Sequence, residues 1–225
     1  MLSFEDLGAG DWEKYGDSIL QSEGVFPEGI RTPKEDFIEV LDDGDGVAKV
    51  ALMDSAYVGN VFGYRIAPDD FEYYGLHDVP KDAKIIYLFN IVVNPDYQGK
   101  GYGKRLLWEF IKAAKAKGYG YVAGHFRQNG SLKLIKAFGA KEEGVCRNWE
   151  NIGEDCVACC LDIHNLSDDD FKPSGEGSGL MPVAPAQEQP EVGPAIAPDA
   201  TPGLHPEMID PSPGVPCEPA PAMRF

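Results

Sequence analysis

The stretch from residue 83 to residue 118 constrains the fold more than any other part of this 225-residue sequence. Residues 84–93 are almost continuously apolar, which is typical of a strand buried on both faces. Asn94-Pro95-Asp96 ends the strand, three glycines follow within residues 98–104, and an amphipathic helix begins directly after them. A buried strand joined to a helix by a short glycine-rich loop predicts an α/β fold with a ligand at that loop.

The segments on either side complete this unit. Their periodicities predict helices at 12–22 and 131–138, a hairpin of strands 47–53 and 57–66, and further strands at 119–126, 141–150 and 155–163. A strand, a helix and a second strand of these lengths indicate that 84–93 and 119–126 pair in parallel through a right-handed crossover.

A second helix is expected to begin at Thr32-Pro33-Lys34-Glu35, with Thr32 as its N-cap and Pro33 at its first position. Asp42 to Gly46 ends this helix and loosely resembles a calcium loop, but we interpret it as a turn because no ligating Glu follows. Residues 67–83 form a polar loop with several aromatic residues, and the sequence leaves open whether this loop is functional or a plain insertion.

Residues 165–225 differ in composition from the rest of the chain. They contain 13 of the 18 prolines, and their 10 acidic and 2 basic residues give −8 of the net charge of −17. This stretch has few large apolar side chains, so it cannot bury enough surface to offset the entropy of ordering. We therefore predict a folded domain over residues 1–164 and a disordered, acidic, Pro/Ala-rich tail over residues 165–225.

The acidic balance argues against binding to nucleic acid or to an anionic membrane, and it suits a cationic acceptor such as an amine. No apolar run approaches the roughly 18 residues needed to span a bilayer, and the first residues lack the features of a signal peptide. The five cysteines then indicate reduced thiols in a cytoplasmic protein. Cys156-x-x-Cys159 lies in an apolar run and is interpreted as structural, so no metal site is expected.

The sequence of the glycine loop distinguishes between three kinds of phosphate-binding motif. A Walker A loop requires Ser or Thr after Gly103-Lys104, where this sequence has Arg105, and a dinucleotide motif requires glycine in place of Lys104. What remains is Gln98-x-x-Gly101-x-Gly103 between a buried strand and a helix. This pattern resembles the Gln/Arg-x-x-Gly-x-Gly/Ala signature of the GNAT superfamily of N-acetyltransferases.

The resemblance extends over residues 3–163 and is strongest over residues 83–140. Residues 128–140, from Gln128 through Phe138-Gly139-Ala140, resemble the second cofactor segment of that family. The resemblance implies a mixed, twisted sheet with helices on both faces. It also implies that the two parallel strands separate and that the pantetheine arm of acetyl-CoA, the expected co-substrate, lies between them.

The resemblance further implies which residues hold acetyl-CoA. The main-chain groups of Ile91 and Val93 would bind the pantetheine arm and polarise the thioester carbonyl. The loop amides would bind the pyrophosphate, with the cations of Lys100, Lys104 and Arg105 around it. The expected cofactor-binding residues are Ile91, Val92, Val93, Gln98, Gly99, Lys100, Gly101, Tyr102, Gly103, Lys104 and Asn129.

The sequence departs from the family pattern at the reacting centre. A carboxylate is common late in the central strand, where Phe89 and Asn90 stand, and a tyrosine is common in the short helix, where Ile135 stands. The catalytic candidates that remain are Asn90, which could position a water molecule, and His125, the nearest group able to titrate. The other interpretation of His125 is a hydrogen-bonded core residue. Outside candidates for acceptor binding are Glu39, Asp69, Asp70 and Glu72.

The expected function is therefore transfer of an acetyl group from acetyl-CoA to a primary amine, on a small molecule or a protein, by direct attack. The missing carboxylate and tyrosine motivate an alternative, in which the same fold is an acyl-CoA-binding or regulatory module with weak or no turnover. The sequence leaves open whether the chain forms a homodimer.

Overall fold

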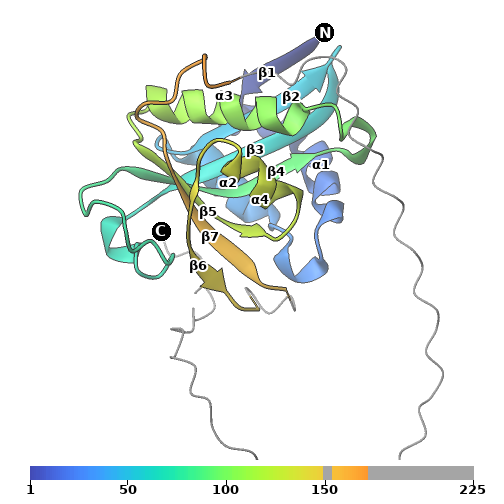
Figure 1. Cartoon of the computed structure of the whole chain (residues 1–225). Helices are drawn as coiled ribbons and strands as arrows, with labels where there is room; N and C mark the ends of the chain where they lie inside the picture. The colour runs from blue at the N-terminus through green and yellow to red at the C-terminus, as the bar shows by residue number, and fades with distance from the viewer. Residues whose placement is uncertain (149–153, 172–225) are drawn as a thin grey trace, which may run out of the picture. The chain divides into compact units, whose positions relative to one another are not determined.

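The computed structural model describes residues 1–148 and 154–171 (Figure 1). These residues form one mixed sheet in the order β1-β2-β3-β4-β5-β7-β6. Its strands are β1 (Leu2–Asp6), β2 (Val47–Met53), β3 (Ala56–Ile66), β4 (Ile85–Val93), β5 (Tyr121–Arg127), β6 (Lys141–Cys146) and β7 (Cys156–Asp162). The α-helices are α1 (Trp12–Ser22), α2 (Lys34–Asp42), α3 (Tyr102–Ala116) and α4 (Gly130–Lys136). Short 3-10 helices lie at Ala9–Asp11, Glu23–Val25, Glu28–Ile30, Pro68–Asp70 and Pro95–Tyr97. The predicted mixed α/β class is confirmed.

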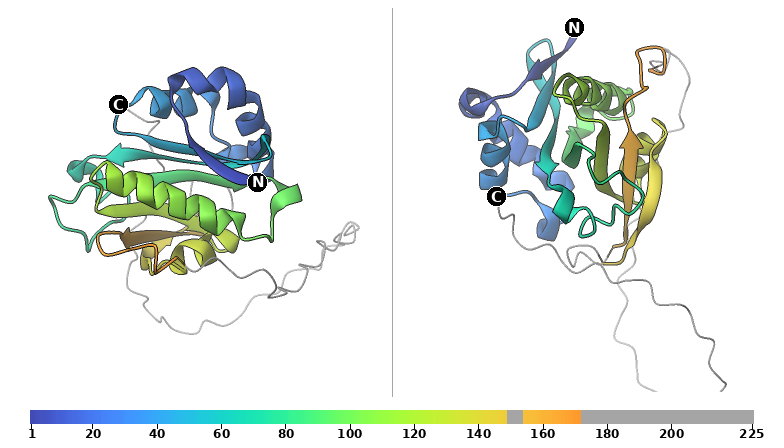
Figure 2. Two further views of the ribbon diagram at one scale, coloured as in Figure 1. Left: turned by 90° about the horizontal axis from the view of Figure 1, so that it is seen from above. Right: turned by 90° about the vertical axis from the view of Figure 1, so that its left-hand side faces the viewer.

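Helices cover both faces of the sheet, and the right-hand view of Figure 2 shows α1 and α2 on one side of the strands and α3 on the other. The apolar stripe of α3 is fully buried, as its spacing predicts, and packs against strands β2, β3 and β4, while α4 packs against β5 and β7. Tyr15 and Ile19 of α1 and Phe37 of α2 pack on the opposite face, beside Phe62 of β3. Two apolar layers therefore enclose the sheet.

The central strands β4 and β5 are parallel, as predicted, but they pair over a short length only. The pairs are Ile85 with Tyr121, Ile86 with Val122, and Tyr87 with Ala123, after which the strands separate. All the other neighbouring strands are antiparallel. The separation expected from the family resemblance is therefore present, and it begins after Tyr87.

A β-bulge interrupts the pairing of β4 with β3 at the point where β4 leaves β5. Phe62 pairs with Asn90 and Gly63 with Leu88, so Phe89 is the extra residue. The bulge shifts the alternation of side chains along β4. Phe89 packs among the apolar residues on the α1 side, and the Asn90 side chain bonds to a residue on that same side.

Most of the predicted elements are confirmed, with small differences at their ends. α1 has the predicted bounds, β3 begins one residue early, and α4 spans residues 130–136 instead of 131–138. The strand predicted over 141–150 ends at Cys146, and part of the predicted range lies outside the described residues.

Near the N-terminus one strand was missed and one expectation was wrong. Strand β1 was not predicted: Leu2 and Phe4 alternate with polar residues, but two apolar positions are too short a pattern to indicate a strand. Helix α2 begins at Lys34, and Thr32 is not its N-cap residue. The main-chain amide of Thr32 instead donates to Oε2 of Glu23 at 2.8 Å.

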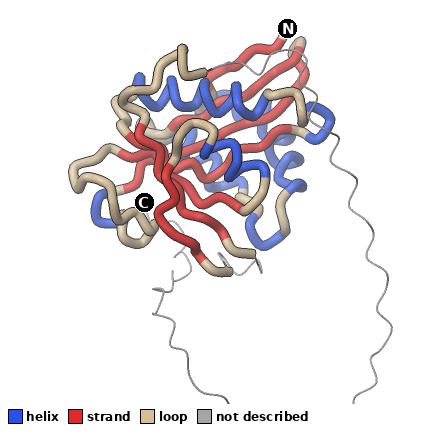
Figure 3. Tube along the Cα trace, in the orientation of Figure 1, coloured by secondary structure: helices blue, strands red, loops and turns tan. Residues whose placement is uncertain are grey.

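The predicted loop at residues 67–83 connects β3 to β4 and is drawn mostly in tan in Figure 3. It is not a detached insertion, because Phe71 and Leu76 are buried in the apolar layer on the α1 side. The ring of Tyr74 in this loop packs at a tilt of 47° against that of Tyr87 in β4, with centroids 4.7 Å apart. The loop therefore adds aromatic side chains to the same face as α1 and α2.

The described chain continues past the predicted domain boundary at residue 164. Leu166 and Phe171 pack against the apolar layer that contains α3. The rest of the predicted disordered tail, residues 172–225, lies outside the described residues. No helix in the described part of the chain is long and apolar enough to cross a membrane.

Gly63 allows α3 to pack closely on β3. A Cβ atom there would lie 2.6 Å from Cζ of Phe110 and 2.9 Å from the carbonyl oxygen of Tyr87. We expect Gly63→Ala to lower the free energy of unfolding by about 1–3 kcal/mol, because overpacking forces the backbone or Phe110 to move. Urea unfolding checks this, with Gly144→Ala as the control because a Cβ at Gly144 meets open space. Equal stability of the two variants would contradict the packing assigned to Gly63.

Candidate active site

The glycine loop between β4 and α3 is open on the side where a ligand would lie. Gly99 and Gly101 have φ angles of +75° and +76°, a left-handed conformation that favours glycine. A Cβ atom at either position would meet no atom within 4 Å. Gly101 is the N-cap residue of α3, so the loop leads directly into the positive end of the helix dipole.

The loop amides are available for a ligand. Within residues 1–148 and 154–171, no hydrogen bond uses the main-chain N–H of any residue from Gly99 to Gly103. Each of these residues is at least partly exposed to solvent. Five successive N–H donors at the start of a helix form a site that suits a phosphate or diphosphate group.

The polar side chains around the loop make different contacts. Gln98 folds back so that its Nε2 donates to the carbonyl oxygen of Val93 at 2.8 Å, which closes the end of β4. The Nζ atom of Lys100 donates to the carbonyl oxygen of Asp96 at 3.1 Å. Arg105, expected beside the loop, instead lies over the ring of Phe4 in β1. Its charge is therefore directed away from the α4 side of the loop.

The gap between β4 and β5 exposes the main chain of alternate residues of β4. The amide of Asn94 donates to Val58 of β3, and a Cβ on Gly59 would lie 2.2 Å from the carbonyl oxygen of Val92, so Asn94 and Val92 face β3. By alternation, Ile91 and Val93 face the gap. The main chain of Val92, one of the expected cofactor-binding residues, is therefore directed toward β3, whereas that of Ile91 has the orientation that a ligand in the gap requires.

Asn90 belongs to a buried polar network on the α1 side of β4. Its Oδ1 accepts a hydrogen bond from Nδ2 of Asn60 at 2.6 Å, and its Nδ2 donates to Oε1 of Glu23 at 2.7 Å. The hydroxyls of Ser22 and Tyr57 donate to Oδ1 of Asn60. The Asn90 side chain is 2% exposed, so it fixes the segment after α1 to the central strand and acts as a positioning residue.

Glu23 is a buried carboxylate that the sequence did not single out. It is 3% exposed and accepts hydrogen bonds from Asn90 and from the amide of Thr32. Burial raises the pKa of its carboxyl above the ordinary value, and the hydrogen bonds oppose that shift. One signal was available, because a carboxylate at the C-terminal end of a helix opposes the helix dipole and needs a specific reason to be there.

His125 lies on the same face of the sheet, within an aromatic wall. Its Nδ1 is 2.7 Å from the hydroxyl of Tyr87, and Tyr87 in turn packs on Tyr64 and Tyr74. Burial lowers the pKa of His125 to about 4, so its imidazole is neutral at pH 7. His125 and Tyr87 come from the two strands that separate, and together they form a hydrogen-bonded pair beside the gap.

Two cavities lie near these groups. One of about 370 Å³ is lined by Arg127, Gln128, Asn129, Glu154 and Asp155. Asn129 is the N-cap of α4, since its Oδ1 accepts from the amide of Ser131 at 2.9 Å. A second cavity of about 380 Å³ lies beside α1 and is bordered by Ser22 and Tyr57 of the polar network.

The remaining candidates do not gather at this site. Glu39, Asp69, Asp70 and Glu72 are all exposed. Ile135 is 1% exposed and packs in the apolar layer under α3. Among the residues that the structure describes, no three His, Cys, Asp or Glu side chains are grouped so that they could hold a metal ion.

The network around Glu23 yields a stability prediction. Both of its partners donate hydrogen bonds, so Glu23→Gln would place an amide N–H against one of them. We expect a loss of about 1–3 kcal/mol in the free energy of unfolding, measured by urea denaturation, because a buried donor is left unsatisfied. Glu28→Gln, an exposed position in the same segment, is the control and should change little. Equal effects of the two substitutions would show that the Glu23 hydrogen bonds do not stabilise the fold.

Comparison with known proteins places this geometry in a family. Residues 17–140 match the family model described as Acetyltransferase (GNAT) family. A search of curated proteins found no match.

Solved structures share the fold at low sequence identity. The ribosomal-protein-S18-alanine N-acetyltransferase of Escherichia coli is 20% identical, with a TM-score of 0.55, and the match covers 74% of this chain and 99% of that chain. NAA60 of Arabidopsis thaliana, crystallised with acetyl-CoA, is 19% identical with a TM-score of 0.61, over 73% of this chain and 100% of that chain. A mosquito arylalkylamine N-acetyltransferase-like protein is 13% identical with a TM-score of 0.56, over 72% and 100%. Since the family match covers more than half of the sequence, and the sheet, the glycine loop and the gap agree with it, the chain belongs to the GNAT family of acetyltransferases.

Proposed function

We propose that this chain is an N-acetyltransferase that transfers the acetyl group of acetyl-CoA to a primary amine. The observation that most supports this function is the row of five amides from Gly99 to Gly103, unbonded within the described residues, at the start of α3 and next to a gap between parallel strands. The amides would bind the pyrophosphate, and the pantetheine arm would extend into the gap along Ile91. The acceptor would approach from the α1 side, where His125 and Tyr87 lie.

The reaction needs the amine in its neutral form. At pH 7, deprotonating a lysine side chain costs roughly 4–5 kcal/mol, whereas an α-amine with a pKa near 8 costs only about 1 kcal/mol. The nitrogen then attacks the thioester carbonyl, the C–S bond breaks, and the CoA thiolate leaves. The excess proton on nitrogen must be removed, and the neutral imidazole of His125, linked to the Tyr87 hydroxyl, is the proposed acceptor.

Two observations favour a second candidate, a CoA-binding module with little turnover. Asn90 takes the place of the common strand carboxylate but is held within the protein network, and Ile135 takes the place of the common tyrosine in α4. An acetyl-transfer assay with a panel of small amines, lysine peptides and peptides with free α-amines separates the two. Transfer to any of them supports the enzyme, whereas tight binding of acetyl-CoA without transfer or hydrolysis supports the module.

The open glycine loop gives the most direct test of the cofactor site. Gly101→Glu should abolish measurable binding of acetyl-CoA in calorimetry, because it adds bulk and a negative charge where the pyrophosphate would lie. Gly118→Glu is the matched control, since Gly118 has a φ of +79° and equally open surroundings at the other end of α3. Binding that survives in Gly101→Glu, or is lost equally in both variants, would refute the assignment of the loop.

The hydrogen-bonded pair of His125 and Tyr87 leads to a prediction about kcat. His125→Phe and Tyr87→Phe should each lower kcat by roughly 10- to 100-fold, with KM for acetyl-CoA unchanged, because they remove proton transfer and not binding. His77→Gln, at an exposed position, should match the wild type. With a His125 pKa of about 4, kcat/KM should rise with pH toward the pKa of the amine, without an inflection near pH 6.5. A wild-type inflection there that His125→Phe removes would contradict a neutral His125.

A further inference from the structure

The end of the described chain returns to the cofactor side of the protein. Residues 163–171, which we call the C-terminal clasp, follow β7 and lie against α3. The Nζ atom of Lys115 donates to the carbonyl oxygens of His164 and Leu166 at 3.1 and 2.5 Å. The indole N–H of Trp108 donates to Oδ1 of Asp168 at 3.0 Å. These bonds fix the clasp to two points on α3, one near its end and one near its middle.

The clasp places an aromatic ring against the middle of α3, within reach of the Lys104 side chain. The rings of Phe171 and Trp108 are parallel within 1°, with centroids 5.7 Å apart. The ring of Phe138, which directly follows α4, is parallel to Trp108 within 5° at 6.0 Å. The Nζ atom of Lys104 lies over both phenylalanine rings, 5.9 Å from the centroid of Phe138 and 5.7 Å from that of Phe171.

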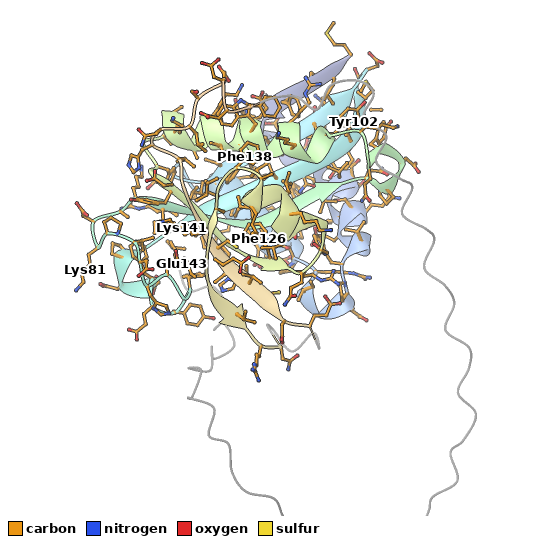
Figure 4. The ribbon with its side chains drawn as sticks, in the orientation of Figure 1. Lys81, Tyr102, Phe126, Phe138, Lys141 and Glu143 are labelled. Atoms are coloured by element: carbon orange, nitrogen blue, oxygen red, sulfur yellow. The ribbon has the colours of Figure 1, made fainter. Side chains whose placement is uncertain are left out.

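Lys104 is the cation of the glycine motif that is held on the α4 side. It directly follows Gly103, whose Cβ position would face Val93 and Leu134 at 3.7 Å, so this side of the helix start borders the end of β4 and α4. Figure 4 shows Phe138 close beneath α3 and Tyr102 at the beginning of that helix. Lys100 and Arg105 are directed elsewhere, toward Asp96 and Phe4.

We propose that Phe171 is a positioning residue of the cofactor site: together with Phe138 it holds the ammonium of Lys104 beside the loop amides, where that charge binds the pyrophosphate of acetyl-CoA. This inference rests on the proposed function and deepens it, because it makes residues after the last strand part of the cofactor site. Aromatic faces suit the task, since they attract an ammonium through the ring quadrupole and leave its positive charge intact for a phosphate.

Substitutions of Phe171 in the full chain test the proposal by calorimetry with acetyl-CoA. Phe171→Ala should raise Kd by about 3- to 10-fold, the range expected for loss of one partly buried cation–π contact. Phe171→Leu, which keeps apolar bulk against Trp108 but has no ring, should raise Kd similarly, whereas Phe171→Tyr should retain wild-type affinity. In steady-state assays KM for acetyl-CoA should follow Kd, with kcat and KM for the amine unchanged.

A double-mutant cycle separates positioning from general stability. Lys104→Met removes the charge and keeps the chain length, and it should raise Kd at least as much as Phe171→Ala. In the Lys104→Met background, Phe171→Ala should then change Kd by less than about 2-fold, because the ring has no cation left to hold. The same fold-changes are expected with acetyl-dephospho-CoA, which lacks the 3′-phosphate but keeps the pyrophosphate.

Three outcomes would overturn the inference while leaving the proposed function in place. They are wild-type affinity in Phe171→Ala, wild-type affinity in Phe171→Leu, and an equal effect of Phe171→Ala with and without Lys104. A loss seen with acetyl-CoA but not with the dephospho compound would overturn the assignment of Lys104 to the pyrophosphate. A wild-type chain that does not bind acetyl-CoA at all would instead overturn the proposed function, and this inference with it.

Discussion

Pairing between β4 and β5 stops after Tyr87 and Ala123, and the rest of the site follows from that interruption. Buried main-chain N–H and C=O groups need hydrogen-bond partners, so a central strand that loses its neighbour is left with groups that something else must satisfy. Gln98 satisfies the carbonyl of Val93 at the end of the strand. Ile91 keeps its groups directed into the gap, and the amides that follow in the glycine loop are likewise unbonded within the described residues. Strand and loop therefore present two sets of main-chain groups, one at Ile91 and one from Gly99 to Gly103, that suit an extended, phosphate-bearing ligand.

On the α1 side of the sheet, polar groups are buried inside an apolar layer and need hydrogen-bond partners there. Two asparagines from adjacent strands and one carboxylate from the segment after α1 bond to one another, so no member is buried without a partner. Removing the charge of Glu23 from water is costly, and the two donors aimed at its oxygens offset part of that cost. The result holds the segment between α1 and α2 at a fixed place on β4, on the side from which an acceptor would reach the gap.

Local sequence patterns were sufficient to predict the central strand and helix. They were insufficient to predict the hydrogen-bond network of Glu23 and Asn90. The strand at Ile85–Val93 and helix α3 could be predicted because continuous apolarity and a 3.6-residue stripe are properties of the segments themselves. The burial of Glu23 could not be predicted, because its hydrogen-bond partner Asn90 lies 67 residues later in the chain. Thr32 had the pattern of a helix cap, but its amide was taken by that same carboxylate. The hydrogen bonds of Asn90 could not be predicted for the same reason, since its partners Glu23 and Asn60 lie 67 and 30 residues away in the chain.

The order of the strands leaves β1 and β6 as the two edges of the sheet. Both are short, and both carry acidic side chains: β1 ends in Glu5-Asp6, and β6 contains Glu142-Glu143. An edge strand with free hydrogen-bonding groups can recruit another chain, and short, charged edges discourage this. Two copies meeting edge to edge would bring like charges together, which opposes both aggregation through the sheet and a dimer built by extending it. The two edges of the described sheet are therefore poor surfaces for pairing with a second copy.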